Sequence, residues 1–344
     1  MQGFRIHSWG GEPIWEEMPD PSPGRGEVLV EVEACSVGLT VLNCINGDLS
    51  NEPGLLPRVP GHEAVGRVLE LGAGVDSSLQ GNRVVVYFYL VCGRCPACRA
   101  GLDPRCSDLG GWVGVHVDGG YAPKMVLPAR NAIPIPVELD PIAATVVADA
   151  VATPVHIAAR AGIGPDDRVV VFGAGGGVGI HMVQVARHAG ATVAGFDVVD
   201  DKLAELERLG VVPVRSDDLS SVDAASVFPD GPPTVVVDLL GTTASARWSI
   251  DGMSMGGRLV NLTTFRDRTF PVDSRELVFR ELSLLGSRYA NRGELVRAAQ
   301  LVASGAVEPI IGATVGPEEV LDLHRRLKAG ELLGRGALDW TRVP

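Results

Sequence analysis

Four cysteines stand close together in the stretch "CGRCPACRAGLDPRC", with the spacing C-x2-C-x2-C-x7-C. Cys92, Cys95, Cys98 and Cys106 offer four thiolates, which can close a tetrahedron around Zn²⁺ and leave no position for water. A site of this type braces a loop and carries out no chemistry itself. The spacing therefore predicts a structural zinc lobe at residues 92–106, with reduced thiols and no metal as the alternative.

A glycine-rich turn follows an apolar segment in "DRVVVFGAGGGVG", and "IHMVQVARHAG" after it is expected to form a helix. The turn and the start of the helix comprise Gly173, Gly175, Gly176, Gly177, Val178 and Gly179. The spacing departs by one residue from G-x-G-x-x-G, because Val178 stands in place of the last glycine. Glycines let the backbone approach a pyrophosphate, and the helix start offers free N–H groups, so a dinucleotide site is predicted.

An acid ends the second predicted strand, "ATVAGFD", at Asp197. Its carboxylate can accept hydrogen bonds from the adenosine ribose hydroxyls and would repel a 2′-phosphate. The next residues, "VVDDK", include no arginine for such a phosphate, and Lys202 is the nearest cation in the sequence. These observations favour NAD(H) over NADP(H) as the cofactor.

The elements that must position these residues follow from the pattern along the chain. The first third has segments such as "EVLVEVE" and "NRVVVYFYL", which are typical of β-strands between glycine turns. From "DRVVVF" onward, strands and helices alternate, which predicts a parallel sheet covered by helices. The tail is expected to hold two helices, "ELVRAAQLVASG" and "EEVLDLHRRLKAG", and a closing strand in "GRGALDW".

Length and charge limit the classes of protein that fit. The chain has 344 residues, more than one hydrophobic core normally supports, so two domains are expected. Its formal net charge of -12 argues against nucleic acid or an anionic membrane as the main partner and favours a small-molecule substrate. The N-terminus "MQGFRIHSWGGEP" lacks the features of a signal peptide, and no uninterrupted apolar run reaches about 18 residues. A soluble cytoplasmic protein is expected.

Together these features resemble the zinc-containing alcohol dehydrogenase family of medium-chain dehydrogenases, nearest to its bacterial secondary alcohol dehydrogenases. The resemblance covers essentially the whole chain, through "PGRGEVLVEV", "PGHEAVGRVLELGAGV", the four-cysteine lobe, the glycine turn and "KAGELLGRGALDW". It implies an α/β protein in which a β-rich, GroES-like catalytic domain is formed by residues 1–150 and 290–344. A doubly wound Rossmann domain that binds NAD, residues 151–289, is inserted, and the active site is expected between the two. A homodimer or homotetramer is also implied.

The resemblance further implies which residues carry the chemistry. His62 of "PGHEAVG", Glu63 and Asp149 would hold a catalytic zinc, the Thr40 hydroxyl would contact the substrate oxygen, and Thr153 would lie near the nicotinamide. Such a zinc acts as a Lewis acid, which lowers the pKa of an alcohol or polarises a carbonyl.

One position departs from the family pattern in a way that puts this zinc in doubt. In "EACSVGLTVLN", Gly38 stands where the family has a cysteine ligand, and the usual second-shell acid is replaced by Val41. Cys35 and Cys44 are the remaining cysteines that could replace the missing thiolate.

Three functions fit these observations. The first is an NAD(H)-dependent oxidoreductase that acts on an alcohol or ketone with a weakened metal site. The second is a reductase without a catalytic zinc that adds hydride to an activated C=C bond, as in an enone, or to a carbonyl polarised by Thr40 or His62. The third is a protein that binds NAD without turnover.

Overall fold

The computed structural model describes residues 1–263, 269 and 272–342, and the chain divides into two compact units. The first unit comprises residues 1–152, 290–305 and 311–344, and the second comprises 153–289 and 306–310. The sequence prediction kept 290–344 together in the first domain. Residues 306–310 lie instead with the second unit, because the Gln184 side chain donates to the Glu308 carbonyl and accepts from the Glu308 N–H.

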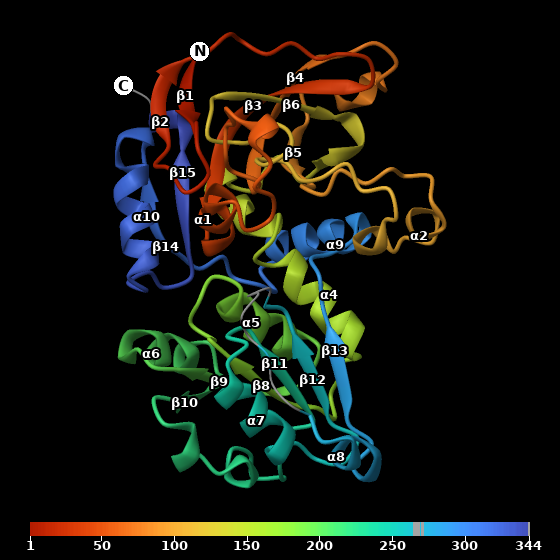
Figure 1. Ribbon diagram of the computed structural model, residues 1–344, viewed down its shortest axis with the longest axis vertical. Helices are drawn as coiled ribbons and strands as arrows, with labels where there is room; N and C mark the ends of the chain where they lie inside the picture. The colour runs from red at the N-terminus through yellow and green to blue at the C-terminus, as the bar shows by residue number, and fades with distance from the viewer. Residues whose placement is uncertain (264–268, 270–271, 343–344) are drawn as a thin grey trace. The chain divides into compact units, whose positions relative to one another are not determined.

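A seven-stranded sheet forms the centre of the first unit, in the order β14-β15-β3-β4-β5-β7, with β6 pairing β3 (Figure 1). β3 is long enough to pair antiparallel with β15 at its C-terminal end and with β6 at its N-terminal end. A separate two-stranded sheet joins β1 and β2. The strands are β1 (Gln2–Arg5), β2 (Ile14–Glu17), β3 (Glu27–Val37), β4 (Ala64–Leu71), β5 (Arg83–Val86), β6 (Lys124–Pro128), β7 (Ala132–Pro134), β14 (Ile311–Val315) and β15 (Arg335–Asp339).

Short helices complete this unit. They are α1 (Leu39–Asn46), α2 (Pro96–Arg99), α3 (Pro141–Ala144), α9 (Arg292–Ala303) and α10 (Val320–Lys328). The two helices and the strand expected in the tail correspond to α9, α10 and β15. Single 3₁₀ turns lie between the longer elements, including η3 (Asp103–Arg105), η5 (Thr145–Val147) and η9 (Trp340–Arg342).

The second unit is a six-stranded parallel sheet in the order β10-β9-β8-β11-β12-β13, the strand order of doubly wound dinucleotide-binding folds. Its strands are β8 (Arg168–Phe172), β9 (Thr192–Asp197), β10 (Val212–Arg215), β11 (Val235–Asp238), β12 (Arg258–Asn261) and β13 (Ser283–Gly286). Its helices are α4 (Ala152–Ala161), α5 (Gly179–His188), α6 (Asp200–Arg208), α7 (Thr243–Gly252) and α8 (Ser274–Phe279). The predicted α/β class with a parallel-sheet domain is confirmed.

The residue pattern explains why the parallel strands are buried. β8 reads "RVVVF" and β11 reads "VVVD", continuous apolar runs that suit a strand covered on both faces. On one side of the sheet, Phe172, Phe196 and Trp248 pack edge to face with ring centroids 5.0–5.4 Å apart. These contacts fix the C-terminal ends of β8 and β9, where the glycine turn and Asp197 lie.

One stretch of the described chain, Pro141–Ala161, is long and apolar enough to cross a membrane by length and composition alone. It is broken into α3, η5 and α4, and 67% of its most apolar window is buried inside the fold. Burial of this kind is typical of a core helix, so the stretch is weak evidence for a membrane span.

Candidate active site and cofactor loop

The "PGHEAVG" segment and the end of β3 lie side by side. β4 begins at Ala64, directly after His62 and Glu63, and pairs with β3 up to Cys35. β15 pairs with the opposite edge of β3, and its second residue, Gly336, lies opposite Val37. The register therefore brings Arg335, the first residue of β15, next to Gly38.

Three predicted site residues come together in the first unit. His62, Glu63 and Asp149 each offer a ligand atom within 4.8 Å of the others, and all three side chains are buried. The His62 Nε2 atom lies 3.4 Å from Glu63 Oε1 and 4.0 Å from Asp149 Oδ2, which are ion-pair distances rather than hydrogen bonds. The imidazole also packs edge to face on Phe88, with ring centroids 4.6 Å apart, so the ring is held in place.

Arg335 is the residue of this cluster that sequence reasoning missed. Its Nη2 atom donates to Glu63 Oε2 at 2.9 Å and to Asp149 Oδ2 at 3.1 Å, and the side chain is buried. A Cβ placed on Gly38 would lie within bonding distance of Arg335 Nη1 and 2.6 Å from Cζ. The guanidinium thus fills the space in which a side chain at position 38 would have to stand.

This arrangement does not fit a catalytic zinc. Two carboxylates and an imidazole are a suitable donor set on their own, but both carboxylates already accept from a guanidinium. A zinc bound to the same oxygens would lie beside that positive charge. The place of the usual cysteine ligand, at Gly38, is filled by the Arg335 guanidinium. The expectation that His62, Glu63 and Asp149 hold a metal therefore conflicts with the position of Arg335.

The charges in the cluster follow from burial and proximity. Burial lowers the pKa of His62, but the Asp149 carboxylate, the Cys44 thiol and Glu63 outweigh it and raise that pKa to about 10. Burial raises the pKa of Glu63 above its ordinary value, and Arg335 opposes that rise. A metal ion would have to displace this proton from the imidazole, and without a metal the cluster is an ion-pair network.

Two further candidate residues, Thr40 and Cys44, lie on helix α1. Cys44 is buried on this helix close enough to His62 to raise its pKa, and Thr40 lies one turn earlier on the same face. Thr40 is partly exposed, as a hydroxyl that meets a substrate must be. Cys35 also lies near Glu63, and burial, followed by the charge of Glu63, raises the pKa of its thiol. Its Sγ is 3.1 Å from the Cβ positions of Gly61 and Gly120, and its thiol donates to the Ser36 carbonyl.

The four cysteines of the lobe fit a zinc ion. Their sulfur atoms lie within 4.8 Å of one another, on α2, η3 and the turns between them. Backbone N–H groups point at the sulfurs: those of Arg94 and Cys95 donate to Cys92 Sγ, and that of Cys98 donates to Cys95 Sγ. The bond from Cys98 contributes most to lowering the pKa of Cys95 to about 6, and the bonds from Arg94 and Cys95 lower the pKa of Cys92, whereas burial raises the pKa of Cys98. The first two shifts favour the thiolate that a metal needs. A bound zinc would cross-link the loop here.

The glycine loop needs its glycines for two different reasons. Gly173 has φ +71°, a left-handed conformation that favours glycine. A Cβ on Gly175 would meet Lys202 Cγ at 2.8 Å, and one on Gly179 would meet Ala174 Cα at 2.8 Å. The missing side chains therefore allow α5 and α6 to approach the loop closely, which is the packing that a dinucleotide-binding turn requires.

Asp197 closes this loop from the end of β9. Its Oδ2 accepts from the Gly175 N–H at 2.9 Å, and its Oδ1 accepts from the Val198 N–H at 2.8 Å. Oδ1 also accepts from the Val199 N–H at 3.3 Å, whereas Oδ2 can accept a further bond from a ribose hydroxyl. Sequence reasoning missed Arg215, which lies beside Asp197 in the β9–β10 register but pairs with Asp200 and Asp217.

Thr153 is a further predicted site residue of the second unit, and His181, which was not predicted, lies beside the glycine loop. Thr153 is buried in the first turn of α4. His181 Nδ1 lies 2.7 Å from the carbonyl oxygen of Gly177, and its Nε2 accepts from the Ile310 N–H at 3.1 Å. The ring therefore carries its proton on Nδ1 and ties the glycine loop to residues 306–310.

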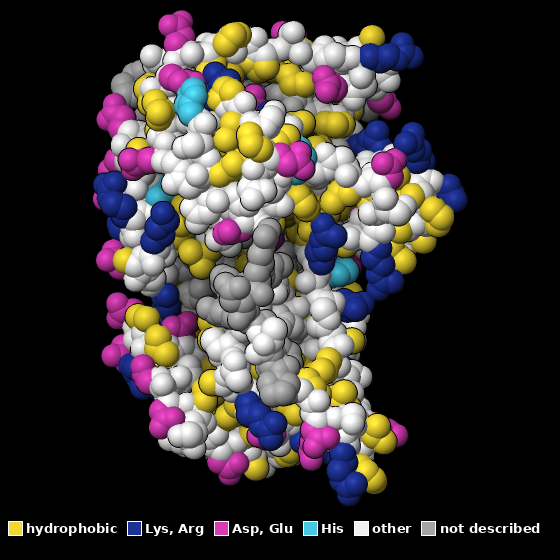
Figure 2. Space-filling model, viewed as in Figure 1, with side chains coloured by type: hydrophobic (Ala, Val, Ile, Leu, Met, Phe, Trp, Pro, Cys, Tyr) yellow, Lys and Arg dark blue, Asp and Glu magenta, His cyan; other side chains and the backbone are white. Residues whose placement is uncertain are grey.

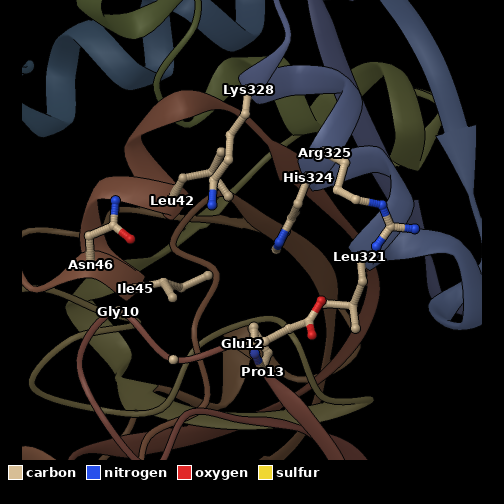
Figure 3. Close-up of a pocket in the computed structure, with 11 residues that line it drawn as sticks. Gly10, Glu12, Pro13, Leu42, Ile45, Asn46, Leu321, His324, Arg325 and Lys328 are labelled. Carbon is tan, nitrogen blue, oxygen red and sulfur yellow. The ribbon is translucent and has the colours of Figure 1, made fainter.

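A small pocket lies apart from these candidates in the first unit. Figure 3 shows Leu42 and Ile45 of α1 on one side of the pocket and His324 and Arg325 of α10 on the other. Its lining includes neither Thr40 nor His62. His324 Nε2 is 2.8 Å from the Tyr121 hydroxyl, and this hydrogen bond holds α10 against the turn that contains Tyr121.

Acidic and basic side chains are interspersed on the face of the molecule shown in Figure 2. Two basic side chains of the second unit, Arg208 and Arg215, are paired with acids on the surface. Such mixing suits a soluble surface with an acidic net charge of -12.

Two family models match the chain in order. Residues 24–137 match the alcohol dehydrogenase GroES-like domain, and residues 177–304 match the zinc-binding dehydrogenase domain. Together these matches cover more than half of the chain, one in the β-rich unit and the other mostly in the doubly wound unit.

Individual proteins are similar over nearly their whole length. An alcohol dehydrogenase of a Moraxella species is 31% identical over 99% of this chain and 100% of its own. An acryloyl-coenzyme A reductase of Metallosphaera sedula is 28% identical over 93% of this chain and 94% of its own. The structure of acetophenone reductase from Geotrichum candidum in complex with NAD is 26% identical, with a TM-score of 0.86, and covers 99% and 98% of the two chains. The chain therefore belongs to the zinc-containing alcohol dehydrogenase family and is an NAD-dependent oxidoreductase.

Proposed function

We propose that this protein uses NAD(H) to interconvert a small alcohol and the corresponding ketone or aldehyde. The observation that carries the proposal is the glycine loop closed by Asp197, a cradle for a dinucleotide that leaves no space for side chains at Gly175 and Gly179. The relative whose structure contains NAD supports the same cofactor.

When bound, NAD(H) supplies or accepts the hydride. The protein must then hold the substrate oxygen and manage one proton. Thr40 is suited to this task, since its hydroxyl is partly exposed at the start of α1 and can both donate and accept. In the direction of reduction, the hydride forms the new C–H bond at the carbonyl carbon, and the proton that Thr40 delivers to the oxygen completes the alcohol.

The buried cluster acts behind Thr40. His62 carries a proton near neutral pH, and Cys44 of α1 lies close to this ring. In our proposal the cluster stabilises negative charge that develops on the substrate oxygen and replaces the proton that Thr40 gives up. Asp149 and Glu63 hold the two positive groups in position.

The test is transfer of deuteride from NADH labelled at C4 to a panel of ketones and aldehydes, read by mass spectrometry of the product. The wild type is expected to place one deuteron on the former carbonyl carbon. Thr40→Val, which removes the hydroxyl and keeps the shape, is expected to lower kcat by about 10²–10³-fold, as loss of one donor to an oxyanion does. Thr40→Ser is the matched control and should retain most activity. No labelled product from any carbonyl would refute this function.

A second function is favoured by the position of Arg335 and by the similarity to acryloyl-coenzyme A reductase. A conjugated carbonyl is already activated toward hydride, so its C=C bond can be reduced without a Lewis acid. Hydride then adds to the β-carbon and a proton to the α-carbon, which consumes one NADH and one proton. Deuterium at the β-carbon of an enone or enoyl thioester, and none on simple ketones, would establish this function instead.

Location and assembly belong to the same proposal. An acidic surface and the whole-chain similarity to dehydrogenases support a cytoplasmic enzyme. We expect a homodimer or homotetramer, which light scattering on the purified protein would measure. A monomer at micromolar concentration would refute the assembly and leave the catalytic proposal intact.

A further inference from the structure

We propose that Arg335 is the resident cation of the buried cluster: its guanidinium occupies the place left by the glycine at position 38, pairs with both Glu63 and Asp149 and keeps a second zinc ion out. This inference concerns the identity of the cation and holds whichever substrate the enzyme reduces.

The first support is volume. A Cβ on Gly38 would fall within bonding distance of Nη1, and it would be 2.6 Å from Cζ and 3.4 Å from Nε. A cysteine would extend one atom further into the same guanidinium. A side chain at residue 38 and the observed Arg335 side chain therefore exclude each other.

The second support is charge. Glu63 and Asp149 are both buried, and a buried carboxylate needs a partner of opposite charge. Arg335 Nη2 donates to both of them, at 2.9 Å and 3.1 Å. The guanidinium therefore supplies to the two carboxylates one of the two positive charges that a divalent metal would otherwise provide.

The third support is the way in which the backbone holds the arginine. Arg335 opens β15, whose ladder with β3 runs from Gly336 opposite Val37 to Asp339 opposite Ala34. A Cβ on Gly336 would meet Leu323 of α10 at 2.8 Å, so the strand is packed closely from behind. Arg335 is thus held beside Gly38 by the sheet register and not by a loop that could turn it elsewhere.

The test counts zinc per chain by elemental analysis after equilibration with Zn²⁺ and removal of the excess. We expect one zinc in the wild type, held by the four-cysteine lobe, and one in Gly38→Cys, whose new side chain meets the guanidinium. We expect two in Arg335→Ala, where His62 and the two carboxylates become available, and two in the double variant that combines both changes. Arg342→Ala, which alters an exposed arginine just beyond the same strand, is the control and should bind one.

Cobalt gives a second readout that does not depend on activity. When Co²⁺ is added to protein whose four-cysteine lobe already holds Zn²⁺, the second site of Arg335→Ala should show no thiolate charge-transfer band, whereas the double variant should show it. If Arg335→Ala fails to fold, Arg335→Met keeps the apolar stem without the charge and is expected to bind the second metal. Arg335→Lys keeps a cation and should stay at one.

Three results would overturn the inference. They are two zinc ions in the wild type, two in Gly38→Cys alone, or one in both Arg335→Ala and Arg335→Met. Because zinc counting requires no substrate, failure here is separate from failure of the deuteride-transfer test of the proposed function.

Discussion

A missing Cβ at Gly38 makes room for a guanidinium that joins two strands and two buried acids. The sequence shows the glycine and shows that a thiolate is absent. It does not show which side chain occupies the space, because Arg335 comes from a distant segment that only the β3–β15 pairing brings near. Cys44, one helical turn after Thr40, could have been placed on the same face of α1 from the i, i+4 spacing.

Gly38→Ala tests this contact at the scale of one methyl group. The new Cβ must displace Arg335 from at least one of its carboxylate partners, so we expect a loss of about 1–3 kcal/mol in stability. The melting temperature from circular dichroism would fall by several degrees. Gly54→Ala is the control, since its Cβ would meet nothing within 4 Å. Equal melting temperatures for the two variants would show that Arg335 moves away without cost.

Asp197→Ser tests the choice of cofactor. Loss of the carboxylate removes charge-assisted hydrogen bonds to the ribose, worth about 1.5–3 kcal/mol, so KM for NADH should rise about 10- to 100-fold. The KM for NADPH should fall relative to the KM for NADH, because the repulsion of a 2′-phosphate is removed. Asp201→Asn, an exposed acid on α6, should leave both values unchanged. If the ratio of the KM values for NADH and NADPH is unaltered in Asp197→Ser, the assignment of Asp197 to the ribose is contradicted.

At the scale of elements, α10 depends on one histidine that lies away from the catalytic cluster. Burial, together with the nearby Lys328, lowers the pKa of His324 to about 4 from an ordinary value of 6.5. The neutral ring accepts from the Tyr121 hydroxyl and so joins α10 to the turn before β6. Protonation would reverse this bond, so that Nε2 donates to the hydroxyl oxygen, and would leave a charge buried beneath the helix.

The pH dependence of stability follows from that shift. Between pH 4 and 6.5 the unfolded chain binds a proton at His324 that the folded protein does not, so stability rises with pH in this window. The contribution is at most about 3 kcal/mol over the window. His324→Gln keeps an acceptor for Tyr121 and should flatten the rise in melting temperature between these pH values. His7→Gln, at an exposed histidine, should keep the wild-type slope. A wild-type slope in His324→Gln would contradict the low pKa.

For the whole molecule, local pattern was sufficient to predict most of the architecture. Strand–helix alternation predicted the parallel sheet, and cysteine spacing predicted the four sulfurs that the fold brings together. Residues 306–310 could not be assigned in this way, because their place depends on bonds from Gln184 and His181 to backbone groups far along the chain. The same holds for Arg335: contacts between distant segments have no local signature.

The two units should respond to different ligands, and amide hydrogen exchange can show this residue by residue. NADH at about 100 times its Kd should stabilise the second unit by about 2.7 kcal/mol and slow exchange of its most protected amides, in β8 and β9, about 100-fold. Amides of β3 and β4 should keep their rates. Removal of zinc with a chelator should speed exchange within residues 92–106 and leave β8 and β9 unchanged. If NADH slows β3 and β8 equally, the chain unfolds as one cooperative body, and the glycine loop alone does not account for the stabilisation.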